Sequence, residues 1–190
     1  MEYLDVVDEN NNLTGKIEER KIIHSNGIWH REIAVWIMNE SGEVLIQKRS
    51  AAKKQEPNKW ALCAGHIDAG EGIKVSAIRE IEEEIGLKIE LNDLVLISIE
   101  KKAKDYGELK NYNFQYQYFV RTKKKIEEYK IQEEELSELK YITISTLEEI
   151  VRDKDEAYTF SDQPYMPKII EMLKRMVMPE KQIDFDDEVR

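Results

Sequence analysis

The segment spanning residues 71–85 constrains the fold of this chain more than any other stretch. Its apolar side chains recur at the spacing of one helical face, so that face must be buried. They are Ala77, Ile78, Ile81 and Ile85. Glu80, Glu83 and Glu84 follow at i, i+3 and i+4 and therefore share another face. Gly86 stands where a helix commonly ends in a left-handed cap. The pattern predicts a helix with one face in a core and three carboxylates on another.

Three carboxylates on one helical face repel one another, at a cost of about 0.2–0.5 kcal/mol for each like-charged pair. A hard cation between them removes that cost, and Mg²⁺ prefers oxygen ligands while sharing its shell with water and substrate phosphates. Arg79 lies four residues before Glu83 and can hold that carboxylate. Taken alone, however, a run of glutamates is more often a solvated helix face, so the run by itself does not establish a metal site.

The pattern around the helix is far more specific than its glutamates. The positions concerned are Gly65, Glu71, Arg79, Glu80, Ile81, Glu83, Glu84, Gly86 and Leu87. Their spacing resembles the Nudix box, Gly-x5-Glu-x7-Arg-Glu-apolar-x-Glu-Glu-x-Gly-apolar, and every fixed position of that motif is filled over residues 65–87. The resemblance implies an α/β (α+β) fold, the Nudix α/β/α sandwich with a mixed central sheet.

The rest of the chain is compatible with that fold. A length of 190 residues fits one domain, which we assign to residues 1–178, with 179–190 as an acidic C-terminal tail. Apolar content and turn residues predict strands at 3–7, 13–16, 32–39, 44–48, 94–100, 113–120 and 139–144. Helices are expected at 18–23, 71–85, 146–152 and 167–178, and a charged loop at 101–110. Ser41 and Gly42 predict a hairpin between the strands at 32–39 and 44–48.

By position in the motif, the resemblance assigns Glu80, Glu83, Glu84 and the Gly65 carbonyl to metal binding. It gives Arg79 a supporting part in catalysis and Glu71 a supporting part beside the substrate. The activity it implies is Mg²⁺-dependent hydrolysis of a diphosphate linkage, in a nucleoside diphosphate derivative or a similar phosphorylated small molecule, by a metal-activated water. Mn²⁺ is expected to substitute for Mg²⁺.

The general base and the phosphate contacts lie outside the box. Some Nudix hydrolases use a glutamate elsewhere as the base, and the run 133–135 offers three, of which we take Glu134 as the candidate. The alternative is that this run is a solvated acidic loop. Lys48 and Arg49 end a strand beside the box, where they either contact substrate phosphates or are simply a solvated strand end.

The sequence flanking the box is similar to the Nudix branch that includes isopentenyl diphosphate isomerase. The similar positions are His24, Trp29, His30, Arg31, Gln47, Lys48, Arg49, Ser50, Trp60, Gly65 and His66. In the isomerase, three histidines and two glutamates bind one metal, while a cysteine and a glutamate handle the protons. Whether the three histidines here form a second metal site or are structural stays open.

The isomerase proton-transfer residues do not carry over to this chain. Ala64 occupies the position of the isomerase cysteine, and Cys63, one residue earlier, should face the opposite side of an extended chain. Asn111 and Asn113 replace the two glutamates and cannot act as bases. Hydrolysis is therefore favoured. The alternatives are isomerase-like activity and a sensor module that binds a nucleotide without cleaving it.

Charge and composition limit the partners. A net charge of −10 argues against a nucleic acid duplex, because binding one requires basic side chains to neutralise phosphates. The single cysteine suits a reducing compartment, and no apolar run reaches membrane-spanning length. We therefore expect a cytoplasmic protein that acts on a diphosphate-containing small molecule without membrane contact. Nudix proteins often dimerise, so a homodimer is a further expectation.

Overall fold

A computed structural model describes residues 1–177 of the chain, so the predicted tail at 179–190 lies outside the described residues. The strands are β1 (Tyr3–Val7), β2 (Leu13–Glu19), β3 (His30–Met38), β4 (Val44–Arg49), β5 (Trp60–Ala61), β6 (Cys63–His66), β7 (Val95–Asp105), β8 (Lys110–Arg121) and β9 (Leu136–Ile142). The helices are α1 (Arg20–Asn26), α2 (Ile73–Ile85), the 3₁₀ turn η1 (Ile126–Glu128), α3 (Ile144–Asp153) and α4 (Met166–Val177).

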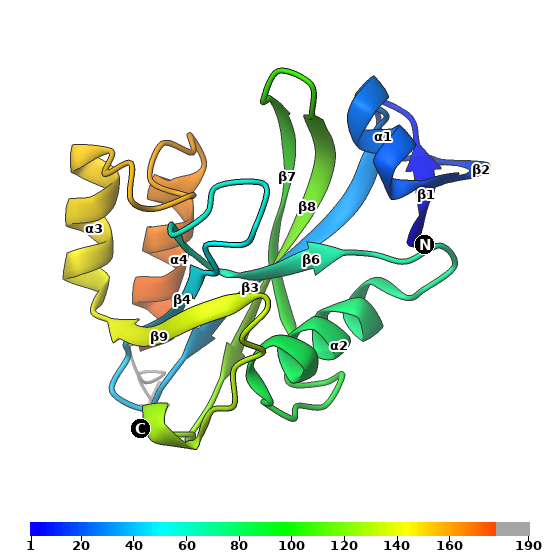
Figure 1. Cartoon of the computed structure of the whole chain (residues 1–190). Helices are drawn as coiled ribbons and strands as arrows, with labels where there is room; N and C mark the ends of the chain where they lie inside the picture. The colour runs from blue at the N-terminus through cyan, green and yellow to red at the C-terminus, as the bar shows by residue number, and fades with distance from the viewer. Residues whose placement is uncertain (178–190) are drawn as a thin grey trace, which may run out of the picture.

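The central sheet is mixed, as predicted. Its order is β5-β4-β3-β8-β7, with β6 also paired to β3 and β9 to β4 (Figure 1). Strand β3 pairs in parallel with residues 113–121 of β8 over the whole length of β3, whereas the other pairs are antiparallel. The first two strands form a separate antiparallel pair. None of the helices described between residues 1 and 177 is long and apolar enough to cross a lipid bilayer.

Two apolar cores lie on opposite faces of the sheet, which gives the predicted α/β/α layering. Successive side chains of a strand point to opposite faces, and β3 is buried on both. Its residues Ile33 and Val35 join the core that contains Ala77, Ile81 and Ile85 of α2. Trp36 and Met38 join the core beneath α3 and α4. Figure 1 shows α2 on one side of the sheet and the pair α3 and α4 on the other. The predicted apolar stripe of α2 is therefore confirmed.

Several of the predicted boundaries need correction. The strand expected at 139–144 is β9, which spans Leu136–Ile142, and the helix expected from 146 begins at Ile144. The expected charged loop at 101–110 is wrong, because β7 continues to Asp105 and pairs with β8 down to Lys110. This part of the ribbon is polar because it extends beyond the apolar core. The helix expected at 18–23 begins only at Arg20, since Glu18 and Glu19 pair with β1. The helix expected from 71 begins at Ile73, after the extended residue Gly72.

The predicted hairpin between β3 and β4 is confirmed, although only Met38 and Val44 are paired in register. Beyond this point the two strands diverge, so that β3 pairs with β6 and β4 pairs with β9 and β5. The divergence leaves β6, which begins the box, beside the centre of the sheet and next to α2.

Candidate active site

A cavity of about 400 Å³ opens between α2, β6, the end of β4 and the β7–β8 ribbon. Its volume is in the range typical of small-molecule sites. From the box, the residues that line it are Gly65, His66, Asp68, Arg79, Glu80, Glu83 and Glu84. The predicted helix therefore directs all three glutamates of its acidic face toward one cavity, as their spacing requires.

Gly65 lies against the Glu80 carboxylate. A Cβ atom added at residue 65 would overlap the carboxylate carbon and both oxygens of Glu80, so no larger residue fits without moving that side chain. Gly65 is held in β6 by antiparallel pairing with Ile33 of β3. The box glycine is therefore required for close approach of the backbone to a carboxylate.

Arg79 connects the box loop to the box helix. Its Nε and Nη2 donate to the two Glu71 oxygens at 3.1 and 3.0 Å, and Nη2 also donates to the His66 carbonyl at 3.2 Å. Its Nη1 donates to Glu80 at 2.8 Å and lies 3.4 Å from Glu83. A guanidinium held by a two-pronged carboxylate contact has a fixed orientation. Arg79 thus positions both acidic side chains, including the predicted contact with Glu83.

Glu71 does not line the cavity, although we expected it beside the substrate. Its carboxylate accepts hydrogen bonds from Arg79 and from the Ser76 hydroxyl, and these contacts hold its pKa below the usual value against the effect of burial. Glu71 therefore acts indirectly, as the motif implies: it holds Arg79, and Arg79 positions the other acidic side chains.

Glu84 is the most enclosed of the three acidic residues. Its side chain is 8% exposed and accepts a hydrogen bond from Gln47 Nε2 at 2.8 Å. Burial raises its pKa to about 7, and burial also raises the pKa of Glu80 despite the adjacent Arg79. Glu83 is more exposed, at 55% for its side chain. Buried carboxylates of this kind are stabilised by a cation among them, so the donor set fits a hard divalent metal.

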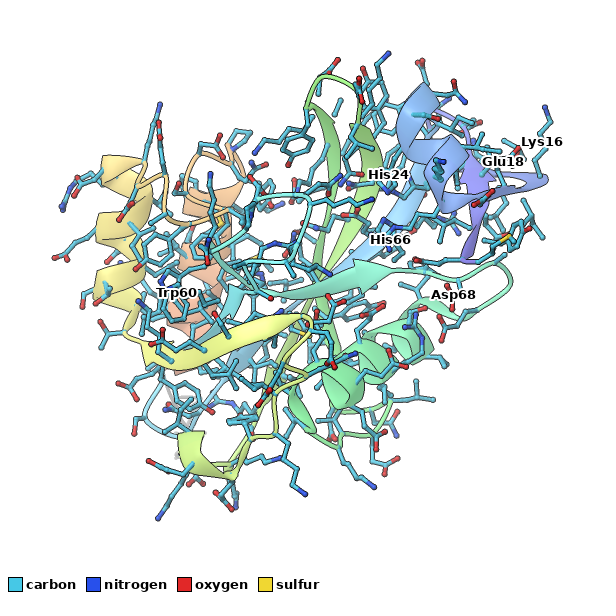
Figure 2. All side chains as sticks on the ribbon, in the orientation of Figure 1. Lys16, Glu18, His24, Trp60, His66 and Asp68 are labelled. Carbon is cyan, nitrogen blue, oxygen red and sulfur yellow. The ribbon has the colours of Figure 1, made fainter. Side chains whose placement is uncertain are left out.

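Three histidines converge beside this acidic group. Figure 2 labels two of them, His24 and His66, which point toward each other. One ligand atom from each of His24, His30 and His66 lies within 4.8 Å of the others. The Nε2 atoms of His24 and His66 are 3.0 Å apart. Glu32 brings a carboxylate to the same point, because its Oε1 lies 3.6 Å from His30 Nε2 and 3.5 Å from His66 Nε2. The cluster therefore offers three imidazole nitrogens and one carboxylate oxygen.

The other ring nitrogens of the cluster are held from outside. His24 Nδ1 donates to the Lys110 carbonyl at 3.2 Å and His30 Nδ1 to the Ile28 carbonyl at 3.0 Å. His66 Nδ1 lies 3.5 Å from the Glu2 carboxylate. Outer contacts of this type fix the tautomer and leave Nε2 free to act as a ligand. Burial lowers the pKa of His24 and His66, which favours their neutral, ligating form.

These features match one known family. A family model described as NUDIX domain covers residues 29–164 of this chain. The chain belongs to the Nudix family.

Relatives support both the hydrolase and the isomerase resemblance. An uncharacterized Nudix hydrolase of Clostridium acetobutylicum is 33% identical over 157 residues, which cover 80% of this chain and 75% of the relative. Isopentenyl-diphosphate Delta-isomerase 2 of Photorhabdus laumondii is 28% identical over 159 residues, covering 83% and 86%. A crystal structure of a Deinococcus radiodurans protein has the same fold, with a TM-score of 0.63 at 19% identity, covering 92% of this chain and 98% of that one. The chain is thus a Nudix hydrolase, and membership supports cleavage of diphosphate bonds in general.

The side chains of Lys48 and Arg49 point in different directions, although the two residues are adjacent in β4. Arg49 lines the cavity, with its Nε and Nη2 donating to the Gln55 carbonyl at 3.2 and 3.1 Å. Lys48 does not line the cavity and lies 5.8 Å from the centre of the Trp60 ring, with Glu138 at 3.9 Å. Neighbouring strand residues face opposite sides. Of these two side chains, only Arg49 faces the cavity.

The glutamate run before β9 contributes a different residue from the one we chose. Glu135 lines the cavity and forms an ion pair with Lys53. Glu134 is exposed and does not line the cavity. Residues 133–135 lie in a turn leading into β9, so the sequence pattern could not determine which of them points inward.

Cys63 and Ala64 also point in different directions along β6. Ala64 lines the cavity, whereas Cys63 is buried beside Glu84 and burial raises its pKa well above the usual value. This arrangement agrees with the alternation that we expected along the extended segment. The position that holds the isomerase cysteine faces the cavity here as a methyl group.

Several cavity residues were not predicted, because each belongs to no motif. They are Glu32, Lys53, Glu56, Lys102, Lys104, Gln115 and Tyr165. Glu32 was read only as the start of an apolar strand, and Lys102 and Lys104 as part of a charged loop. The alternation of Lys102 and Lys104 along one face was the signal that could have identified a strand wall.

Proposed function

We propose that this Nudix hydrolase cleaves a diphosphate linkage in a nucleoside diphosphate derivative or similar phosphorylated small molecule, with Mg²⁺ as the physiological cation and Mn²⁺ able to replace it. The observation that carries the proposal is the convergence of Glu80, Glu83 and Glu84 on one cavity beside Gly65. These carboxylates and the Gly65 carbonyl are the groups that would hold the cation. When bound, the cation neutralises charge on the diphosphate and activates the attacking water.

The residues of the chain supply orientation and proton transfer. Arg49 is available for a phosphate that lies in the cavity, and Arg79 keeps Glu80 and Glu83 in place. In the reaction, a water oxygen bonds to one phosphorus, the bridging P–O bond breaks, and its electron pair leaves with the other phosphate. A carboxylate takes the proton of the water. We assign this task to Glu135, since it lines the cavity and Glu134 does not.

A screen of the purified chain tests the proposed reaction. We expect Mg²⁺-dependent phosphate release, after phosphatase treatment, from at least one member of a panel of nucleoside diphosphate derivatives that also includes isopentenyl diphosphate. Removing divalent cations with EDTA should abolish the release, and Mg²⁺ or Mn²⁺ should restore it. Release that is unaffected by EDTA would contradict the metal assignment. Conversion of isopentenyl diphosphate to its isomer without cleavage would instead favour the isomerase alternative.

We also infer that His24, His30, His66 and Glu32 hold a second cation, distinct from the Mg²⁺ site. His30 is fully buried, and its Nε2 has no hydrogen-bond partner among residues 1–177. A buried polar atom without a partner costs about 1–3 kcal/mol, and a cation at the point where the three Nε2 atoms converge would remove that cost. Imidazole with one carboxylate suits Zn²⁺, Fe²⁺ or Mn²⁺ better than Mg²⁺.

Metal analysis of the purified protein tests this second site. We expect about one equivalent of a transition metal per chain after growth and purification without chelator, a stoichiometry typical of a site with several imidazole ligands. His30→Asn should lose that metal, whereas Glu83→Gln should keep it, because Glu83 belongs to the other donor set. Equal metal content in the two variants would contradict the inference.

A further inference from the structure

The cavity has a second wall, formed by the β7–β8 ribbon and the segment before α4. It contributes Lys102, Gln115, Asn111, Gln163 and Tyr165, all of which are polar. Phe160 also reaches this wall, but its side chain is only 3% exposed and belongs to the core under α3 and α4. This wall therefore presents hydrogen-bonding groups rather than an apolar surface to whatever enters beside the diphosphate.

Within the part of the chain that the structure describes, Lys102 is the lysine of this wall that forms no ion pair with a carboxylate. Among the cavity lysines, Lys53 is paired with Glu135 and Lys104 with Glu56 at 3.1 Å. Within residues 1–177, Lys102 Nζ instead donates to a neutral amide, Gln115 Oε1, at 3.2 Å. Burial lowers its pKa below the usual value, and nearby Glu32 and Glu56 offset only part of that effect. An ammonium in this position is stabilised by an acceptor brought by a ligand.

One acceptor of this wall, Gln115 Oε1, is already fully used. Gln115 Oε1 also accepts from Gln117 Nε2 at 2.7 Å and has the Tyr165 hydroxyl at 3.5 Å. A carbonyl oxygen has two lone pairs, whereas an ammonium has three N–H groups. Within residues 1–177, Lys102 donates one hydrogen bond to a side chain and is therefore left with further N–H groups. A hydrocarbon against this wall would leave them unpaired, while hydroxyl or other acceptor oxygens would pair with them.

We propose that the organic part of the substrate is hydrophilic and rich in acceptor oxygens, as in a sugar, and that Lys102 is the residue that selects it. The inference rests on the proposed function and extends it, since it excludes a diphosphate whose organic part is a hydrocarbon chain. Specificity of this kind arises because a substrate without acceptors leaves buried polar groups of the site unpaired.

Lys101 provides a matched control on the same strand. It faces the other side of β7, where its Nζ donates to the Glu9 carbonyl at 2.7 Å and lies 4.6 Å from the centre of the Trp29 ring. The test measures kcat and KM of the wild type, Lys102→Met and Lys101→Met on ADP-ribose, UDP-glucose and isopentenyl diphosphate. We expect the wild type to prefer one of the two sugar diphosphates. Lys102→Met should raise the KM of that substrate and lower its kcat/KM about 10- to 100-fold, the loss typical of one hydrogen bond to a charged group.

The remaining outcomes separate the inference from the proposed function. In Lys101→Met, kcat/KM should stay within about twofold of wild type, as for an ordinary surface change. A preference for isopentenyl diphosphate, or equal losses in the two variants, would overturn the inference while leaving hydrolysis intact. If no compound is cleaved, the proposed function fails, and calorimetry decides the inference. Binding of a sugar diphosphate that is weakened by Lys102→Met but not by Lys101→Met supports it, and absence of such binding overturns it.

Discussion

Glu83→Gln should lower kcat by at least about 10³-fold on any substrate that the wild type cleaves, because one charged ligand of the catalytic cation is lost where charge neutralisation carries most of the catalysis. The fold should be unaffected. Glu83 is the most exposed of the three box glutamates, and its contact within the chain is the 3.4 Å approach of Arg79. Removing one charge from a repulsive group costs no core packing. The melting temperature measured without divalent cations should therefore equal that of wild type or exceed it.

The adjacent residue supplies the control for this prediction. Glu82 lies on the same helix, is half exposed and is paired loosely with Lys88 at 3.5 Å, and it does not line the cavity. Glu82→Gln makes the same change of charge one position away and should retain nearly the wild-type rate. If Glu83→Gln retains that rate at saturating Mg²⁺, or if both variants lose activity equally, the assignment of Glu83 as a ligand is wrong.

The box could be predicted from sequence because its geometry is local. Residues three and four apart on a helix must share a face, so the convergence of Glu80, Glu83 and Glu84 followed from spacing alone. The apolar stripe opposite them fixed which side of α2 faces the core. The contact of Arg79 with Glu83 could be predicted for the same reason, since the two residues are four positions apart on the helix. None of these results required knowledge of the sheet.

The opposite wall of the cavity could not be predicted, because strand pairing over long distances creates it. Glu32 meets His66 because β3 pairs with β6, and Lys102 lies opposite Asn113 because β7 pairs with β8. In sequence, 34 positions separate Glu32 from His66. Lys102 and Asn113 are only 11 positions apart on one hairpin, but they reach the box only because β8 pairs with β3. A polar strand outside the core also lacks the apolar alternation that identifies strands, which explains the incorrect loop at 101–110.

The choices of Glu134 and Lys48 failed to identify cavity residues for a related reason. Each lies one residue from a position that does face the cavity, Glu135 in one case and Arg49 in the other. In β4, a shift of one residue along the extended chain reverses the direction of the side chain. Glu134 and Glu135 lie in the turn before β9, and the conformation of that turn decides which of them points inward. The composition of a segment can therefore indicate that a carboxylate or a cation is near the site, but the pairing of β4 with β9 determines which one reaches it.

Gly65→Ala should produce the second large effect, through position rather than charge. The added methyl group would overlap the carboxylate of Glu80, which is itself enclosed and bonded to Arg79 at 2.8 Å. Relief requires movement of Glu80 or of β6, and displacement of a catalytic group by about 1 Å can cost 10²-fold in rate. Because Glu80 or β6 would be displaced, we expect kcat/KM to fall by about 100-fold or more. The melting temperature should also fall, since β6 pairs with the buried strand β3.

Gly72→Ala is the control for this prediction. It also replaces a glycine of the box by alanine, but at a position where the backbone does not closely approach a carboxylate. Gly72 has φ −73°, which alanine adopts readily, and a Cβ atom there would meet Val75 at an ordinary 3.4 Å. As the N-cap residue of α2, where glycine is preferred over alanine, it should accept alanine at a cost of about 0.5–1 kcal/mol. Activity and melting temperature measured for both variants decide the matter. Should Gly65→Ala remain as active as Gly72→Ala, the backbone at residue 65 does not need to approach Glu80 for catalysis, and its assignment beside the cation would have to be abandoned.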